Sequence, residues 1–231
     1  MTALVTRLFD ARADLESALA ERLARAVGAP GTTAAHMLSG GGTPLPAYRA
    51  LAARPPPRNP QLHVLFSDER YVPADSPASN YRHIEPLLAA LALPAAAVLR
   101  VRTELTLEDA ARDYERQLAA LLESGLRIGL GLLGLGADGH TASLFSAADI
   151  ERGRGRLAVA VLRPDGLSAV SVTAELLAQV EEPLFVVAGA DKREAVRSLL
   201  AQDPNLTAWR AVAGCARVEL WVDRSAAPAL A

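Results

Sequence analysis

The residues best suited to chemistry lie in the segment LGLGADGHTASLF, residues 133–145. An apolar run ends there in a glycine-rich turn that carries an acid, Asp138, a histidine, His140, and two hydroxyls within six residues. Histidine has the side chain whose ordinary pKa lies closest to neutrality, so His140 could take and return a proton at working pH. Open α/β sheets also bind ligands beyond the carboxyl ends of their strands. The residues alone leave open whether His140 is a catalytic base or a structural histidine.

A second candidate site is the segment SGGGTP, residues 39–44, which follows a short apolar run and opens a predicted helix. Glycines allow a tight turn whose N–H groups point at an anion, and a helix N-terminus adds a favourable dipole. The alternative is a plain strand-to-helix turn, and no Gly-Lys-Ser/Thr follows to make a Walker loop. We favour a phosphate-binding loop formed by Ser39, Gly40, Gly41, Gly42 and Thr43.

Other charged side chains could hold a phosphorylated sugar. The adjacent acids Asp68 and Glu69 follow a predicted strand and could position a base or bind a sugar hydroxyl. Arg82 could grip a phosphate with two hydrogen bonds. A solvated loop with a surface ion pair explains these three residues equally well. Lys192 begins a predicted helix after a late strand, where it could reach a phosphate or simply face solvent.

The glycines also match the dinucleotide fingerprint G-x-G-x-x-G twice, at residues 129–134 and 134–139. The first match lies inside the apolar strand, and the second is followed by His-Thr-Ala-Ser rather than by a clear long helix. The motif has meaning only between the strand and the helix of a nucleotide-binding unit. We therefore expect no nicotinamide cofactor.

The elements that must position these residues alternate between strand and helix. Helices are predicted at residues 9–27, 44–53, 80–91, 106–124 and 190–201, with Pro86 weakening the third. Strands are predicted at residues 34–39, 62–67, 98–101, 128–135, 157–162, 169–173, 184–188 and 218–222, and loops at 54–60 and 68–78. This alternation indicates an α/β fold with a mostly parallel sheet and helices on both faces. No linker divides the chain, so residues 1–231 form one predicted domain.

Composition narrows the classes of function. The 231 residues are 51% apolar with a formal net charge of −2, which suits a globular protein with a sizeable core. Without a basic stripe or a membrane-length apolar stretch, we expect no nucleic-acid and no membrane partner. The N-terminal residues lack a signal-peptide pattern, so a cytoplasmic location is the simplest expectation. The single Cys215 excludes an internal disulfide and a Cys-based zinc site, and His36, His63 and His83 lack metal-ligand spacing.

Taken together, these segments resemble the 6-phosphogluconolactonase family, in the group that includes the glucosamine-6-phosphate isomerases/deaminases. The matching segments are LSGGGTP (38–44), SDERYVP (67–73), SNYR (79–82), LGLGADGHTASLF (133–145), GADK (189–192) and VELWVD (218–223). The resemblance implies a three-layer, Rossmann-like sandwich of the ribose-phosphate isomerase type, with no metal and no organic cofactor. It implies hydrolysis of 6-phospho-D-glucono-1,5-lactone to 6-phosphogluconate in the oxidative pentose phosphate pathway. We expect that small lactone as the partner of a monomer or weak homodimer.

Carried over to this sequence, the resemblance makes His140 the general base that activates water and later protonates the leaving ring oxygen. Asp68 would orient the sugar or the histidine, and backbone N–H groups of residues 134–139 would stabilise the oxyanion. The substrate- and phosphate-binding residues that it implies are Ser39, Gly40, Gly41, Gly42, Thr43, Arg82, Asp138, Gly139 and Lys192.

One segment departs from the family pattern. The family usually has an Arg-apolar-Thr-apolar-Thr strand, whereas this chain reads AVSVT at residues 169–173. Ala169 therefore stands where the family carries arginine. Whether the nearby Arg163 compensates stays open at the level of sequence.

Two other functions compete with the lactonase. Glucosamine-6-phosphate isomerases/deaminases share the Asp-Gly-His turn but usually carry a glutamate a few residues after the histidine, and residues 141–146 contain no acid. A non-catalytic sugar-phosphate sensor would keep the phosphate grip without the base, and no DNA-binding helix-turn-helix is evident. The sequence therefore favours the lactonase.

Overall fold

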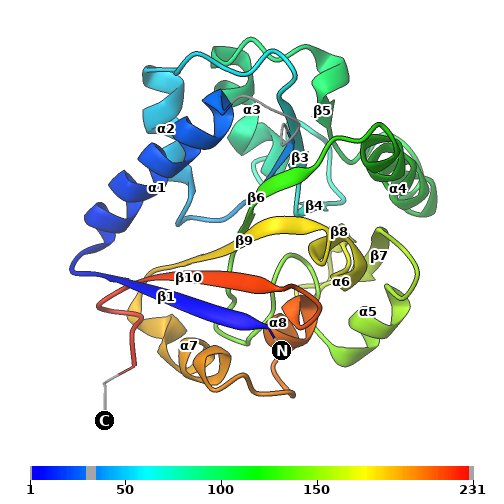
Figure 1. The fold of residues 1–231 in the computed structure, drawn as a ribbon. Coiled ribbons are helices and arrows are strands. Elements are labelled where there is room, and N and C mark those ends of the chain that lie inside the picture. Colours follow the sequence, from blue (N-terminus) through cyan, green and yellow to red (C-terminus); the bar gives the residue numbers. More distant parts are fainter. Residues whose placement is uncertain (1, 30–34, 229–231) are drawn as a thin grey trace.

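The computed structural model describes residues 2–29 and 35–228. Its centre is a seven-stranded sheet in which each pair of neighbouring strands runs parallel (Figure 1). In spatial order the strands are β1 (Ala3–Phe9), β10 (Arg217–Asp223), β9 (Val180–Val187), β6 (Ile128–Leu133), β2 (Ala35–Leu38), β3 (His63–Phe66) and β5 (Val98–Leu99). The predicted α/β fold with a mostly parallel sheet is confirmed.

Helices cover both faces of this sheet. Alternate residues of a strand point to opposite faces, so Leu184 joins the core under α1, α2 and α3, whereas Phe185 joins the core that contains α4, α7 and α8. This arrangement gives the three layers expected of a doubly covered parallel sheet. The helices are α1 (Arg12–Gly28), α2 (Leu45–Ala53), α3 (Asn80–Ala90), α4 (Leu107–Glu123), α5 (Ala147–Arg152), α6 (Ala174–Leu177), α7 (Arg193–Leu200) and α8 (Thr207–Val212).

A second, three-stranded antiparallel sheet lies beside the first, in the order β4-β8-β7. Its strands are β4 (Asp68–Arg70), β8 (Ser168–Val172) and β7 (Ala158–Leu162). The prediction of a loop over 68–78 is therefore wrong in its first three residues, which form β4. The strands predicted at 157–162 and 169–173 exist, but they pair with each other in the separate sheet. Local pattern predicts a strand and does not say which sheet it joins.

Other differences from the prediction have local causes. The N-terminal edge strand β1 was not predicted, because most of its side chains are exposed and give no clear alternation. Phe9 ends β1, and the first helix begins only at Arg12. β9 begins at Val180, four residues before the predicted strand 184–188. The prediction missed this start because Glu181 and Glu182 are charged and exposed. α3 runs through Pro86.

Short elements account for the rest. The helix predicted at 190–201 divides into a 3₁₀ turn, Ala190–Lys192, followed by α7. A further 3₁₀ turn covers Ala95–Ala97. Helices α5, α6 and α8 are too short to show helical periodicity in the sequence. Residue 34 of the predicted strand 34–39 lies outside the described residues. Across the described part of the chain, no helix combines the length and apolarity needed to cross a bilayer.

Candidate active site

A cavity of about 260 Å³ opens where β2, β6 and β9 end. The segments that follow these strands line it, namely the glycine loop of residues 39–43, the start of the 134–140 turn and Ala188. Asp68 and Arg70 of β4 also contribute to its wall. This volume lies at the small end of ligand sites and suits a small polar molecule.

The glycine loop, residues 39–43, lines the cavity in full. A side chain at Gly40 would collide with the Oδ1 atom of Asn80, and Gly41 has a φ of +96°. Arg12 donates a hydrogen bond of 2.9 Å to the carbonyl of Gly42. The C=O and N–H of a trans peptide point in opposite directions, so this bond turns the N–H of Thr43 away from Arg12. The loop immediately precedes α2, whose N-terminus favours an anion.

A tight turn holds His140 at the end of β6. Gly136 donates its N–H to the carbonyl of His140 at 2.9 Å, and Gly139 donates to the carbonyl of Gly136 at 3.0 Å. A side chain at Gly136 would collide with the imidazole ring, and Gly139 has a φ of +83°. The glycines therefore allow the histidine to pack against its own turn. The sequence predicted that backbone N–H groups of residues 134–139 would bind the oxyanion. The N–H groups of Gly136 and Gly139 form hydrogen bonds within the turn, so they are not available for this role.

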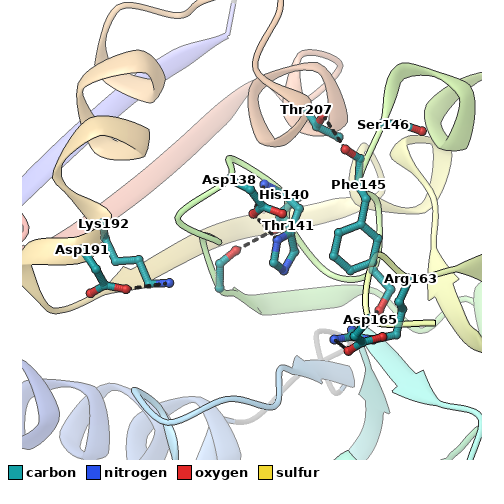
Figure 2. Close-up of polar contacts among 12 residues, drawn as sticks. Asp138, His140, Thr141, Phe145, Ser146, Arg163, Asp165, Asp191, Lys192 and Thr207 are labelled. Atoms are coloured by element: carbon teal, nitrogen blue, oxygen red, sulfur yellow. Dashed lines mark hydrogen bonds and ion pairs between the residues drawn. The ribbon is translucent and has the colours of Figure 1, made fainter. Parts of the chain in front are cut away.

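Asp138 is the carboxylate that contacts His140. Its Oδ1 atom lies 2.5 Å from Nδ1 of the imidazole (Figure 2). Burial alone would raise the pKa of Asp138, but the hydrogen bond and the charge of His140 outweigh it, and the pKa is lowered. An ionised Asp138 accepts the Nδ1–H of a neutral imidazole, which leaves Nε2 as the atom that can accept a proton. The ring also packs on Phe145, with centroids 4.4 Å apart.

Asp68 lies in the same cavity with different partners. Its carboxylate is buried and accepts hydrogen bonds from Ser67 Oγ at 2.9 Å and from Ser143 Oγ at 2.7 Å. The sequence left Asp68 to orient either the sugar or the histidine. Asp138 is the carboxylate that accepts the hydrogen bond of the histidine, so the position of Asp68 suits contact with a ligand.

Glu69, next to Asp68, has a structural role. Its carboxylate accepts the N–H groups of Asn80 and Tyr81, both at 2.7 Å, and the hydroxyl of Ser79 at 3.2 Å, at the start of α3. Burial raises its pKa even though these bonds favour the charged form. Glu69 thus fixes α3 against β4 and keeps Asn80 beside the glycine loop.

The predicted phosphate ligands divide into two groups. Lys192 lines the cavity, with Nζ 3.3 Å from Oδ2 of Asp191 (Figure 2). Arg82 is exposed, lies outside the cavity and donates a hydrogen bond to the carbonyl of Asp75. In this structure Arg82 is therefore not placed to contact a phosphate in the cavity, because its guanidinium is hydrogen-bonded to Asp75 instead. Asp138 and Gly139 are also not among the residues that line the cavity. Asp138 pairs with His140, and the carbonyl of Gly139 accepts the N–H of Ala208.

Two arginines without a predicted role in binding line the cavity instead, Arg70 and Arg163. Arg70 lies on β4 and donates to the carbonyl of Ala78 at 2.9 Å. Arg163 follows β7, two positions beyond Val161, which pairs with Ala169. Residues two apart in a strand share a face, so Arg163 supplies a guanidinium on the face where Ala169 has only a methyl group. The cavity therefore has a guanidinium from Arg163, although Ala169 supplies none.

Two further expectations from the sequence concern metal ions and nucleotides. Within residues 2–29 and 35–228, no group of three or more His, Cys, Asp or Glu side chains is arranged to hold a metal ion. After Gly139 the chain forms a small bridge between Thr141 and Leu144, and α5 begins only at Ala147. The fingerprint at 134–139 therefore lacks the adjoining helix that a dinucleotide site requires.

Comparison with known proteins identifies the family. Residues 10–220 match the family described as glucosamine-6-phosphate isomerases/6-phosphogluconolactonase. The protein belongs to this family. The 6-phosphogluconolactonase of Thermotoga maritima is 37% identical over 172 residues, which cover 73% of this chain and 75% of that protein. A crystal structure of 6-phosphogluconolactonase from Thermotoga maritima has a TM-score of 0.78 at 29% identity and covers 96% of this chain and 100% of its own. The resemblance stated from the sequence is confirmed.

The fold alone does not separate the two activities of this family. The structure of a monomeric glucosamine-6-phosphate deaminase has a TM-score of 0.80 with this chain at 19% identity, and the match covers 96% and 98% of the two chains. The distinction must therefore come from the side chains of the site.

Proposed function

We propose that this member of the family hydrolyses 6-phospho-D-glucono-1,5-lactone to 6-phosphogluconate, with His140 as general base and without a metal or organic cofactor. The observation that carries the proposal is that His140, which is paired with Asp138, lines the same cavity as the glycine loop. The loop suits a phosphate, and the histidine suits proton transfer at a carbonyl carbon. The curated relatives named 6-phosphogluconolactonase support the same substrate.

The proposed reaction proceeds in two steps. Nε2 of His140 takes a proton from water as the water oxygen attacks C1 of the lactone, and the carbonyl oxygen becomes an oxyanion. The C1–ring oxygen bond then breaks as the imidazolium returns the proton to that oxygen. The product is the open-chain acid, which ionises to a carboxylate. Asp138 stabilises the imidazolium that forms between the two steps, because its carboxylate accepts the Nδ1–H.

The phosphate of the substrate would lie against the glycine loop and Lys192. N–H groups of the loop, the N-terminus of α2 and the ammonium of Lys192 all favour an anion. Because the phosphate does not react, its binding energy serves to hold C1 in reach of His140. Asp68, with its carboxylate held by two serine hydroxyls, would accept a hydrogen bond from a sugar hydroxyl.

The protein is proposed to work in the cytoplasm as a monomer or weak homodimer. The single cysteine is buried and without a disulfide partner, which fits a reducing compartment. Size-exclusion chromatography with light scattering measures the oligomeric state directly.

The test is hydrolysis of the lactone by the purified protein. The lactone is generated in situ, the 6-phosphogluconate is followed with a coupled dehydrogenase, and the spontaneous rate is subtracted. Replacing His140 with Ala should lower kcat about 10²- to 10⁴-fold, the contribution typical of a general base. His63→Ala is the matched control, because His63 lies at the start of β3, at the opposite end of the sheet.

The outcomes separate the competing functions. Turnover that collapses in His140→Ala and persists in His63→Ala supports both the activity and the base. Turnover that survives in His140→Ala keeps the activity and removes the base. Absence of lactone turnover, with ammonia release from glucosamine 6-phosphate, supports the deaminase. Binding of sugar phosphate without turnover of either substrate supports a sensor.

A further inference from the structure

The cavity has cationic side chains on two sides of His140. Figure 2 shows Lys192 and Arg163 on opposite sides of the imidazole, and both line the cavity. The proposed lactone has one anionic group, its phosphate, whereas the product 6-phosphogluconate has two, because hydrolysis creates a carboxylate at C1. With the phosphate at the glycine loop and Lys192, Arg163 would face the end of the molecule where the new charge appears.

The ring of Phe145 contacts both Arg163 and His140 and so places the two side chains close together. Its guanidinium carbon lies 5.2 Å from the centre of the Phe145 ring, and the same ring packs on His140 with centroids 4.4 Å apart. The Arg163 side chain is only 15% exposed, so its charge is partly desolvated and acts strongly on a neighbouring anion. Stacking on Phe145 also restricts where the guanidinium can point.

The guanidinium is only partly satisfied by the protein. Nη2 donates to Oδ2 of Asp165 at 2.8 Å, and Nε lies 3.1 Å and 3.2 Å from the two oxygens of that carboxylate. Nη1 makes a long contact of 3.5 Å with Ser143 Oγ, which itself donates to Asp68 at 2.7 Å. Nη1 therefore has hydrogen-bonding capacity left for a ligand on the side of Asp68 and His140.

Asp165 neutralises Arg163 from the outer side. Its side chain is 48% exposed, and it does not line the cavity. It also accepts the N–H of Leu167 at 3.1 Å, so the β7–β8 turn holds the carboxylate in place. A bound carboxylate must share the charge of Arg163 with Asp165, which lowers the net attraction that the ligand experiences.

We propose that Arg163 binds the C1 oxygen as it becomes negative, and then the product carboxylate, and that Asp165 limits the strength of this binding. The inference rests on the proposed lactonase function and assigns the two ends of the substrate. Lys192 and the glycine loop hold the phosphate end, and Arg163 holds the carbonyl end. Partial neutralisation by Asp165 would favour release of a doubly anionic product.

Two ligands of the same length distinguish the ends of the site. 6-Phosphogluconate carries both phosphate and carboxylate, and glucitol 6-phosphate carries the phosphate alone. Isothermal titration calorimetry gives the Kd of each ligand. Arg163→Gln should weaken 6-phosphogluconate about tenfold or more, the typical effect of losing a hydrogen bond to a charged group, and change glucitol 6-phosphate less than about twofold. Lys192→Gln should weaken both ligands by similar factors.

Asp165→Asn provides a test with the opposite sign. It removes the competing charge and keeps the shape, so 6-phosphogluconate should bind about threefold more tightly while glucitol 6-phosphate is unchanged. Arg224→Gln is the matched control, because Arg224 forms a comparable ion pair with Asp10 and its side chain is 67% exposed, away from the cavity. If Arg163→Gln fails to fold, Arg163→Lys keeps the charge, loses the planar fork and should show the same selectivity with a smaller factor.

Three outcomes would contradict the proposed role of Arg163 or Asp165, or the proposed function. If Arg163→Gln weakens both ligands equally, or neither, Arg163 does not bind the carboxylate. If Asp165→Asn weakens 6-phosphogluconate as Arg163→Gln does, Asp165 orients the arginine rather than competing for it. Lactone turnover by the wild-type protein is measured first. Its absence overturns the proposed function, whereas its presence with unselective variants overturns only this inference.

Discussion

The carboxylate of Asp138 meets the imidazole of His140 through Nδ1, at a distance of 2.5 Å from Oδ1. The two residues are separated in the chain only by Gly139, whose φ of +83° turns the backbone so that both side chains meet. Acid and base therefore come from one turn, and no other part of the fold is needed to pair them. The fold is needed to bring this turn to the glycine loop.

Replacing Asp138 with Asn should lower kcat by roughly one order of magnitude, less than the loss of His140 itself. The amide cannot stabilise the imidazolium by charge, and the 55% exposure of Asp138 moderates the effect through solvent screening. Steady-state kinetics on the lactone measures kcat and KM separately, and KM should change little. The control is Asp10→Asn, an exposed acid paired with Arg224. An unchanged kcat in Asp138→Asn would show that the pair is not used in catalysis.

Gly40→Ala should destabilise the protein by about 1–3 kcal/mol, because the new methyl group collides with Asn80 and overpacks the site. Gly42→Ala is the matched control within the same loop. A Cβ at Gly42 meets no atom within 4 Å, so its free energy of unfolding should change by less than about 1 kcal/mol. Urea denaturation of both variants gives the comparison. Equal losses would mean that backbone freedom, rather than the approach of Asn80, requires the glycine.

His36 should make the protein less stable in mild acid. The residue is 5% exposed, its Nδ1 accepts the N–H of Leu130 at 3.1 Å, and its Nε2 contacts the carbonyl of Ala26 at 2.9 Å. Burial is the largest cause of its lowered pKa, the Ala26 bond partly opposes it, and the charge of Arg22 adds to it. On acidification through the ordinary value of 6.5, the unfolded chain gains a proton before the folded one does. Stability is therefore lost as pH falls below that value.

The measurement is the free energy of unfolding in urea at about pH 7.5 and about pH 5.5, where one such group changes it by up to about 1.4 kcal/mol per pH unit. His36→Gln, whose amide can donate to Ala26 and accept from Leu130, should flatten this dependence. His63→Gln, at a less buried position, should leave it in place. A dependence that survives in His36→Gln would assign it to other groups.

Cys215 should be unreactive in the folded protein. Its side chain is buried, it contacts the carbonyl of Leu177 at 3.3 Å, and burial raises its pKa to about 11. The thiolate is the reactive form, so an aromatic disulfide reagent at about pH 8 should label the native protein slowly and the urea-unfolded protein at once. Labelling of the native protein at the rate of a free cysteine would show that this region opens readily.

Which elements the sequence predicts depends on how they are buried. β2 and β6 are predicted because a strand buried on both faces is apolar at successive positions. β1 lies at the edge of the sheet with most side chains exposed, and β4 has three polar residues, so neither shows a strand pattern. The pairing of β7 with β8 in a second sheet also has no signal in the local sequence pattern, because it depends on partners elsewhere in the chain.

The site residues also fall into those predicted from local sequence and those placed by tertiary packing. By itself, the sequence placed Asp138 and His140 in one turn, the glycine loop before a helix, and Asp68 at a strand end. It assigned Asp138 to substrate binding, whereas the structure pairs Asp138 with His140. These features depend on neighbouring residues and on the rule that parallel strands end at one edge. Only the tertiary structure decided that Arg163 enters the cavity and that Arg82 leaves it. The physical reason is that a long side chain has its charged group several ångströms from the backbone, so its place depends on packing between elements far apart in sequence.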